Sequence, residues 1–332
     1  MAKLVAQTKR DEEGRQRAEK LDRAKLSFQD GYTTRDQMVQ VCDFFMNKKS
    51  EEGLRDKLSF LLSHFCMLRG ESVREMELAD MQMISLQNES KNRNCPALIC
   101  LLRQGKTNQF HRLEVAATIR AENTFICSLS SLAMYFVWRW HLSGENFPSF
   151  ADPDKWYDIK LLKGGNGITT PMSYNTHLER IDEAFKAAKI RSKAKTHAAR
   201  GSAVRMAEID GCPEESIRRC GRWNNKALEG CYMSQLPREA MRVLAGFNKD
   251  PGNYFLRRDC RDPPISLQCQ IYPSIDEMLQ RHEEEDGVEI NLAAIGFLKL
   301  LKELRIIFIQ DSVELRERYP DHPIWRLDLF DS

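Results

Sequence analysis

A chain of 332 residues is long enough to bury one large hydrophobic core or two smaller ones. Apolar residues make up 42% of it and charged residues 30%, a balance that fits a folded globular protein and excludes an intrinsically disordered one. The formal net charge is only +2, so total charge indicates no polyanionic partner, and a nucleic-acid site can come only from local clustering of cations.

The first 32 residues form a predicted charged helical lead-in or linker, because they alternate in charge and contain no aromatic residue before Phe28. One packed domain is expected over residues 33–332, where apolar residues begin to recur at regular spacing. The chain shows no internal repeat and no low-complexity tract.

Most of the domain carries apolar residues at helical spacing, in places behind a capping residue such as Ser50. Segment 290–310 is the most apolar, but its four charged residues exclude a membrane span and predict an amphipathic core helix. The Pro- and Gly-rich stretch 147–171 predicts an irregular connection. Helices are expected within 33–46, 50–68, 123–144, 173–190, 196–232, 237–247, a segment beginning at Ser274, and 290–310.

One region near a third of the length has β character instead. Apolar runs at 81–86 and 97–102 are followed by a third run at 110–118. The polar Gly-Lys-Thr-Asn loop between the last two predicts an antiparallel hairpin with Lys106 at its turn. The predicted fold class is therefore mainly α with a small antiparallel β-sheet (α+β).

Ten cysteines are scattered along the chain, and no cleavable apolar segment opens it. We therefore expect reduced thiols in an intracellular compartment rather than a disulfide framework. The two closest pairs, Cys95/Cys100 and Cys212/Cys220, lack the CxxC spacing and the neighbouring histidines of a zinc site. No metal and no other cofactor is expected.

Cations cluster in the second half of the chain. Seven of them, and no carboxylate, occur between residues 186 and 205, and three arginines follow within 218–222. In a chain close to neutrality this clustering favours a face that binds a polyanion such as DNA, although a solvated basic helix explains the same composition. The cations are Lys186, Lys189, Arg191, Lys193, Lys195, Arg200, Arg205, Arg218, Arg219 and Arg222.

The segment 196–232 contains the residue types that cut a phosphodiester without a metal. Such chemistry needs a covalent nucleophile, fixed cationic donors for the non-bridging oxygens, and a proton for the leaving oxygen. Tyrosine, arginine and lysine can supply these three roles. Here His197 lies three residues before Arg200, Trp223 follows Arg200 by 23 residues, and Tyr232 follows Trp223 by nine.

These offsets resemble those of the tyrosine recombinases, in which an HxxR motif precedes a histidine or tryptophan and then the tyrosine nucleophile. Gly211 also falls where that family turns between two helices. The resemblance implies that Arg200 clamps the scissile phosphate, His197 accepts or positions the tyrosine proton, Trp223 completes the wall of the site, and Tyr232 attacks. A buried tyrosine with no catalytic role is the alternative for Tyr232.

Two further residues of the tyrosine recombinase site would lie earlier in this chain. In "RGESVREMELAD", Arg74 is followed three and four residues later by an acidic and an aliphatic residue, as is the family's first catalytic arginine. Arg69 is the competing choice, and Arg74 is preferred. Lys106 stands in the predicted hairpin turn, where recombinases carry their general-acid lysine.

A closer resemblance extends from about residue 33 to near the end. The segments "GRWNN", "EGCY", "LPREAMRVLAGF", "YFLRR" and "FLKLLKELRIIFIQD" resemble the fungal branch that includes Crypton-type transposon recombinases and the large DNA-binding subunit of the yeast point-centromere complex. The resemblance implies a nuclear protein with double-stranded DNA as its partner and no membrane association. Recombinases grip DNA with two domains, so it also implies an N-terminal clamp domain or a partner that this chain lacks.

Two functions follow from the resemblance. The first is a strand-exchange enzyme that acts through a 3′-phosphotyrosyl intermediate, as a dimer or a synaptic tetramer. The second is a DNA-binding module of the same fold that recognises a centromere or another chromosomal site without cutting it. A scaffold that binds an acidic protein partner is a third alternative.

Overall fold

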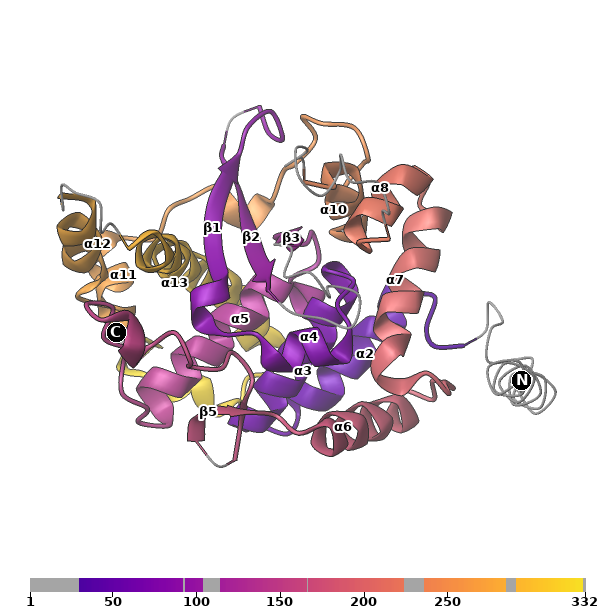
Figure 1. Cartoon of the computed structure of the whole chain (residues 1–332), viewed down its shortest axis with the longest axis horizontal. Coiled ribbons are helices and arrows are strands. Elements are labelled where there is room, and N and C mark those ends of the chain that lie inside the picture. The colour runs from indigo at the N-terminus through magenta and orange to yellow at the C-terminus, as the bar shows by residue number, and fades with distance from the viewer. Residues whose placement is uncertain are drawn as a thin grey trace, which may run out of the picture.

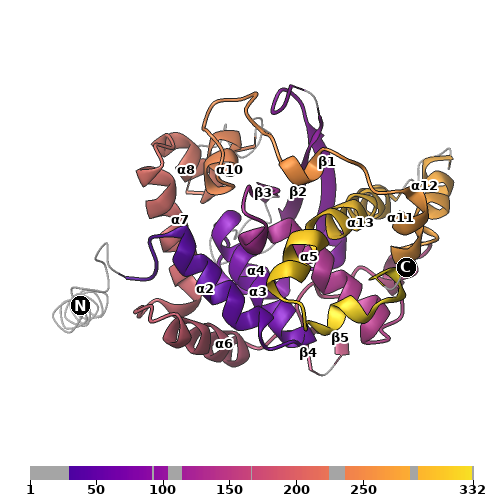
Figure 2. The same ribbon diagram turned by 180° about the vertical axis from the view of Figure 1, so that it is seen from behind.

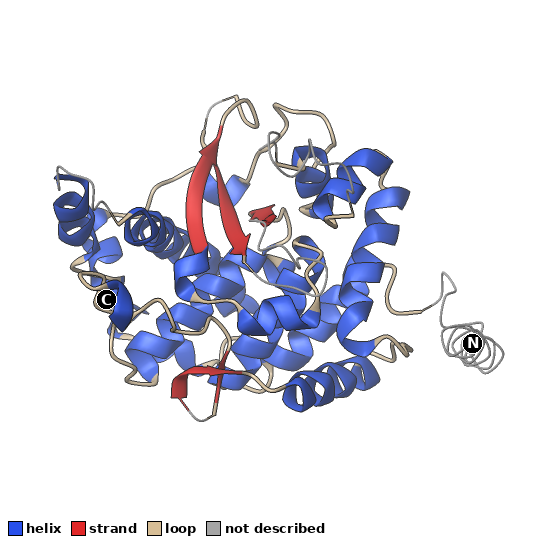
Figure 3. Cartoon of the chain, in the orientation of Figure 1, coloured by secondary structure: helices blue, strands red, loops and turns tan. Residues whose placement is uncertain are grey.

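The computed structural model describes residues 30–91, 93–103, 114–165, 167–223, 236–284 and 291–330. These residues are mainly helical, with a three-stranded antiparallel sheet and a separate two-stranded hairpin (Figure 3). The expected α+β class is therefore confirmed. Nearly all of the predicted charged lead-in, 1–32, lies outside the described residues.

Two capped helices follow each other at the start of the described chain. α2 (Arg35–Met46) begins after Thr34, whose side chain takes part in a capping box. α3 (Glu51–Phe65) begins after Ser50, whose hydroxyl accepts a hydrogen bond from the backbone amide of Gly53, as the sequence predicted. α3 is buried along almost its whole length, so it is the central helix of the fold.

The sheet has the strand order β1-β2-β3, with β1 (Met81–Leu86), β2 (Cys95–Leu102) and β3 (Glu114–Ile119) all antiparallel. β2 and β3 pair up to Leu102 opposite Glu114, so the predicted hairpin is confirmed. Its turn, which includes Lys106, lies outside the described residues.

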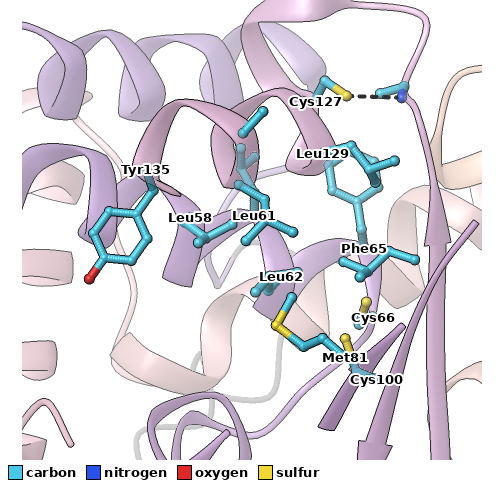
Figure 4. Packing of buried hydrophobic residues seen from close by; sticks show 14 of the residues in the cluster. Leu58, Leu61, Leu62, Phe65, Cys66, Met81, Cys100, Cys127, Leu129 and Tyr135 are labelled. Carbon is cyan, nitrogen blue, oxygen red and sulfur yellow. Dashed lines mark hydrogen bonds between the residues drawn. The ribbon is translucent and has the colours of Figure 1, made fainter. Parts of the chain in front are cut away.

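The core lies where α3 and the sheet meet α5 (Ser128–Val137). Figure 4 shows Leu58, Leu62 and Phe65 of α3 gathered near Leu129 of α5, with Met81 and Cys100 of the sheet beneath them. Burial of these apolar side chains supplies the main favourable term in folding.

The long helix α13 (Leu292–Arg318) covers α5 and β1. Its approach to β1 is close, because a Cβ atom at Gly296 would lie only 2.8 Å from the Cβ of Gln82. The expected helix at 290–310 is confirmed and extends further, and Figure 2 shows it together with the tail that follows it. Within the described ranges, no helix combines the length and the apolar character needed to cross a membrane.

The other helices complete the shell. α7, α8 and α10 gather at one end of the molecule, across from α11 and α12 (Figure 1). Their bounds are α4 (Gly70–Glu75), α6 (Tyr174–Ala187), α7 (Ala198–Ile209), α8 (Glu214–Cys220), α10 (Arg238–Leu244), α11 (Ile265–Ile271) and α12 (Ile275–Glu284).

Two expectations were wrong in detail. The long helix expected at 123–144 is divided, since extended backbone at Cys127 separates a 3-10 turn from α5, and a π-helical turn follows at Trp138–Leu142. The connection 147–171 ends in a hairpin of β4 (Lys163–Gly164) and β5 (Gly167–Pro171). A strand of two residues is too short to produce a recognisable alternation of apolar and polar residues.

A buried ionic cluster fastens α13 to the core. The carboxylate of Asp311, which is fully buried, accepts hydrogen bonds from Arg120 Nη2 at 2.5 Å and Arg258 Nε at 2.7 Å. Its second oxygen accepts a hydrogen bond from the hydroxyl of Ser130. Three elements far apart in sequence therefore depend on one carboxylate.

The substitution Asp311→Ala should lower the free energy of unfolding by about 3–5 kcal/mol, because two buried guanidinium groups lose their carboxylate. Urea denaturation measures this loss. The matched control is Asp321→Ala, because the Asp321 side chain is 84% exposed and lies 3.6 Å from Lys49. The control should change stability by less than about 0.5 kcal/mol, and equal losses in the two variants would contradict the account.

Candidate functional site

Two predicted motifs from distant parts of the chain lie on neighbouring helices. α4 begins directly after Arg69 and carries Arg74. The HxxR segment passes through a 3-10 turn into α7, with His197 just before the helix and Arg200 in its first turn. α3 packs against both α4 and α7, so it sets the separation of the two motifs.

The turn between α7 and α8 leads the chain toward Trp223. Gly211 has a φ of +77°, a left-handed conformation that glycine adopts at little cost, and the predicted turn at this position is confirmed. α8 ends at Cys220, and the amide of Trp223 donates a hydrogen bond to the carbonyl of Arg218 at 3.0 Å.

Arg200 is buried, with 8% of its surface exposed, and its partners are uncharged. Its Nη2 donates to the carbonyl oxygen of Gly221 at 2.5 Å, and its Cζ lies 4.6 Å from the ring centroid of Trp223. Its Nη1 is also buried and has no hydrogen-bond partner among the described residues. A buried guanidinium with an unused donor is suited to receive an oxyanion.

The electrostatics of Arg200 point the same way. Burial lowers the pKa of Arg200 to about 10, and the positive charges of Arg222 and Arg69 act in the same direction. The group remains cationic at neutral pH. Three cations therefore share one neighbourhood, and a bound anion would relieve their mutual repulsion.

Arg74 has different neighbours. Its Nη1 lies 3.4 Å from Nδ1 of His177 on α6, and its Cζ lies 5.4 Å from the ring centroid of Tyr174. The charges of Arg74 and His197 both act on His177, whereas that of Arg69 acts on Arg200. The two arginines left open by the sequence thus occupy different parts of the site.

Arg222 serves as a structural link. Its guanidinium donates to the carbonyl oxygens of Cys66 at 3.0 Å, Met67 at 2.7 Å and Cys220 at 3.0 Å. The first two are carbonyls at the C-terminal end of α3, which the helix itself leaves without partners. Its Nε also lies 3.9 Å from the carboxylate of Glu114, which brings the base of the β2–β3 hairpin beside the site.

Lys106 and Tyr232, the expected general acid and nucleophile, lie outside the described residues. Their predicted roles therefore stay predictions. The base of the hairpin that carries Lys106 adjoins Arg222, as described above, and Tyr232 follows Trp223 in the chain.

The remaining cations predicted to contact DNA differ in their surroundings. Arg205 donates to the backbone carbonyl of Asp30 and to the hydroxyl of Ser202, so it holds the entering chain against α7. Four others form ion pairs, namely Lys186 and Lys195 with Asp182, Arg218 with Glu214, and Arg219 with Glu215. Lys189, Arg191 and Lys193 are exposed on the segment between α6 and α7.

Three residues of the site escaped sequence reasoning. His177 lies on the buried side of α6, and the hydroxyl of Ser59, one of several polar residues on the buried helix α3, lies 3.1 Å from its Nε2. The carbonyl of Gly221 belongs to the backbone. The only available signal was the mixed face of the helix at 173–190, where a histidine occupies a position in line with buried apolar residues.

The chain has a tyrosine recombinase-like fold. The chain is similar to a solved structure described as "FLP Recombinase-Holliday Junction Complex I", with a TM-score of 0.50 and 14% identity over 93% of this chain and 71% of that one. It is also similar to a "Flpe-Holliday Junction Complex", with a TM-score of 0.47 and 13% identity over 85% of this chain and 63% of that one. A third similar structure is a "Flpe W330F mutant-DNA Holliday Junction Complex", with a TM-score of 0.49 and 14% identity over 95% of this chain and 73% of that one. The chain thus spans less than two thirds of the Flpe chain in the first of these two complexes.

The chain belongs to the family described as the centromere DNA-binding protein complex CBF3 subunit, domain 2, whose model matches residues 32–332. This confirms the expected resemblance to the centromere branch of the tyrosine recombinase fold, while the likeness to Crypton-type recombinases stays a prediction. No curated protein matches the chain.

The substitution Arg222→Met should lower the free energy of unfolding by about 2–3 kcal/mol, because carbonyls at the end of α3 lose a charged donor. Thermal and urea denaturation measure the change. The matched control is Arg218→Met, since Arg218 is 58% exposed and, in the part of the chain that the structure describes, is ion-paired with Glu214 alone, one turn away. We expect at most about 0.5 kcal/mol for the control. A loss at Arg222 no larger than this would show that the link is dispensable.

Proposed function

We propose that this chain binds double-stranded DNA through the face formed by α4, the turn at Lys195–His197 and the start of α7. The observation that carries the proposal is the environment of Arg200, a buried cation whose described partners are neutral and whose Nη1 has no hydrogen-bond partner among them. A backbone phosphate offers Arg200 a negative charge and an acceptor oxygen for Nη1, neither of which its described hydrogen-bond partners supply. The family's description as a centromere DNA-binding subunit supports the same ligand and a nuclear location.

Of the two arginines open for the first position, we favour Arg69 as the partner of Arg200 on one phosphate. Its charge acts on Arg200, whereas Arg74 lies against His177. Two guanidinium groups on one phosphate would supply donors to both non-bridging oxygens.

For a short duplex, the logarithm of the association constant should fall linearly with the logarithm of the salt concentration, because cationic side chains that contact phosphates displace counterions from the DNA. The substitution Arg200→Gln should weaken binding and lower the magnitude of the salt slope by about one. Fluorescence anisotropy with a labelled duplex measures both quantities. The control is Arg281→Gln on α12, at the opposite end of the molecule, which should leave the slope unchanged.

Arg200→Lys separates the effect of charge from that of donor geometry, since it keeps the cation but loses the planar donors. Circular dichroism confirms that each variant folds. Unchanged binding by a folded Arg200→Gln variant would contradict the proposed site.

Strand cleavage is a second candidate function, favoured by the cation and the tryptophan that the structure brings together at Arg200 and Trp223. In this reaction the Tyr232 oxygen would attack the phosphorus to form a 3′-phosphotyrosyl bond. The bond to the 5′ oxygen would break, and Lys106 would donate the proton that this oxygen takes up. His197 would accept or position the tyrosine proton.

A nicked suicide duplex tests cleavage, because the short 5′-hydroxyl fragment between the cut and the nick diffuses away, and its loss traps the covalent intermediate. We expect an adduct that resists denaturing gel electrophoresis and that Tyr232→Phe abolishes. A wild-type protein that binds the duplex without forming any adduct would contradict catalysis and leave a DNA-binding module.

A further inference from the structure

We infer that Arg74, Tyr174 and His177 form a second phosphate-binding subsite, which receives a DNA backbone phosphate next to the one held by Arg69 and Arg200. The inference rests on the proposed DNA binding. It gives Arg74 a role in positioning DNA, and it makes His177 the residue that positions Arg74.

The hydrogen bonds of His177 fix the direction in which it accepts. The side chain is 2% exposed, with Nε2 lying 3.1 Å from the hydroxyl of Ser59 and Nδ1 lying 3.4 Å from Nη1 of Arg74. A guanidinium only donates, so Nδ1 accepts and Nε2 carries the ring proton toward Ser59. The imidazole can play this part only while it is neutral.

The charge on Arg74 is therefore held in place without being cancelled. Burial and the neighbouring cations lower the pKa of His177 to about 4, so its ring is neutral at physiological pH. Tyr174, the other neighbour of Arg74, presents an aromatic face that is also uncharged. Among the described residues no carboxylate is ion-paired with Arg74. Arg218 and Arg219, by contrast, each lie within 3.0 Å of a glutamate carboxylate.

The subsite opens into a hollow that continues to the HxxR turn. A Cβ atom at Gly70 would lie 3.2 Å from Nη1 of Arg74 and 3.3 Å from Cβ of Thr196, so Arg74 borders the residue before His197. Tyr174, Thr196 and His197 line the hollow, together with Leu178, Glu179, Asp182, Lys193, Ala194 and Lys195.

The two carboxylates of the hollow do not exclude an anion. Asp182 is paired with Lys186 at 2.7 Å and with Lys195, and these hydrogen bonds lower its pKa. Glu179 is exposed to solvent, where its charge is screened. The two lysines among the lining residues match these two carboxylates in number, so Arg74, which borders the hollow beside Gly70 and Thr196, adds a positive charge to it.

A double-mutant cycle on DNA binding tests the inference. We would measure anisotropy of a labelled duplex over a salt series with the wild type, Arg74→Gln, His177→Phe and the double variant. Arg74→Gln should weaken binding and lower the magnitude of the salt slope by about one. His177→Phe should weaken binding in the wild-type background but have little further effect in the Arg74→Gln background. His177→Asn, which keeps an acceptor near the position of Nδ1, should restore most of the affinity.

Two results would overturn the inference while leaving DNA binding intact. One is a salt slope for the Arg74→Gln variant that equals that of the wild type. The other is an equal loss from His177→Phe in both backgrounds, which would mean that His177 acts only on stability. Absence of binding by the wild type at low salt would instead overturn the proposed function together with this inference.

Discussion

The hydrogen bonds from Arg222 to the end of α3 hold the two halves of the candidate site together. Cys66 and Met67, whose carbonyls it binds, lie immediately before the segment that leads to Arg69. The next residue after Arg222 is Trp223, which covers Arg200. One guanidinium therefore links segments that are more than a hundred residues apart in sequence, and it adds to the packing of α3 against α4 and α7.

The site also depends on how the fold distributes partners among its arginines. Arg120 and Arg258 share the buried carboxylate of Asp311, so their charges are compensated within the protein. Arg200 and Arg74 have carbonyl, imidazole and aromatic neighbours instead, which orient a guanidinium without neutralising it. Retaining buried or half-buried cations in this way costs stability, and an external anion restores what is lost. The charges of Arg120 and Arg258 are thus compensated within the protein, whereas the proposed function assigns those of Arg200 and Arg74 to a ligand.

Much of the fold was predictable because it rests on local rules. Helical periodicity located most of the longer helices but not the short α4 and α11. The hydroxyl of Ser50 marked a helix start, and Gly211 marked the turn between α7 and α8. The placement of His197 and Arg200 together at the start of α7 follows from a similar local rule, since residues three apart there lie near the same face. These signals need no knowledge of what packs against them.

The rest of the site depends on contacts between distant segments. Sequence alone could not separate Arg69 from Arg74, because what distinguishes them is proximity to Arg200 or to His177. Nor could it show that Arg205 and Arg222, counted among the predicted DNA contacts, donate to backbone carbonyls. A cation in a basic run has the same composition whether it faces solvent or a carbonyl, and only the tertiary structure decides between them.

The central claim is that the cation centre at Arg200 receives a backbone phosphate, and a crystal structure of the chain bound to duplex DNA tests it most directly. The account predicts one phosphate within hydrogen-bonding distance of both Arg69 and Arg200, with a non-bridging oxygen accepting a hydrogen bond from Nη1 of Arg200. Duplex DNA bound on another face, with Arg200 remote from every phosphate, would contradict it.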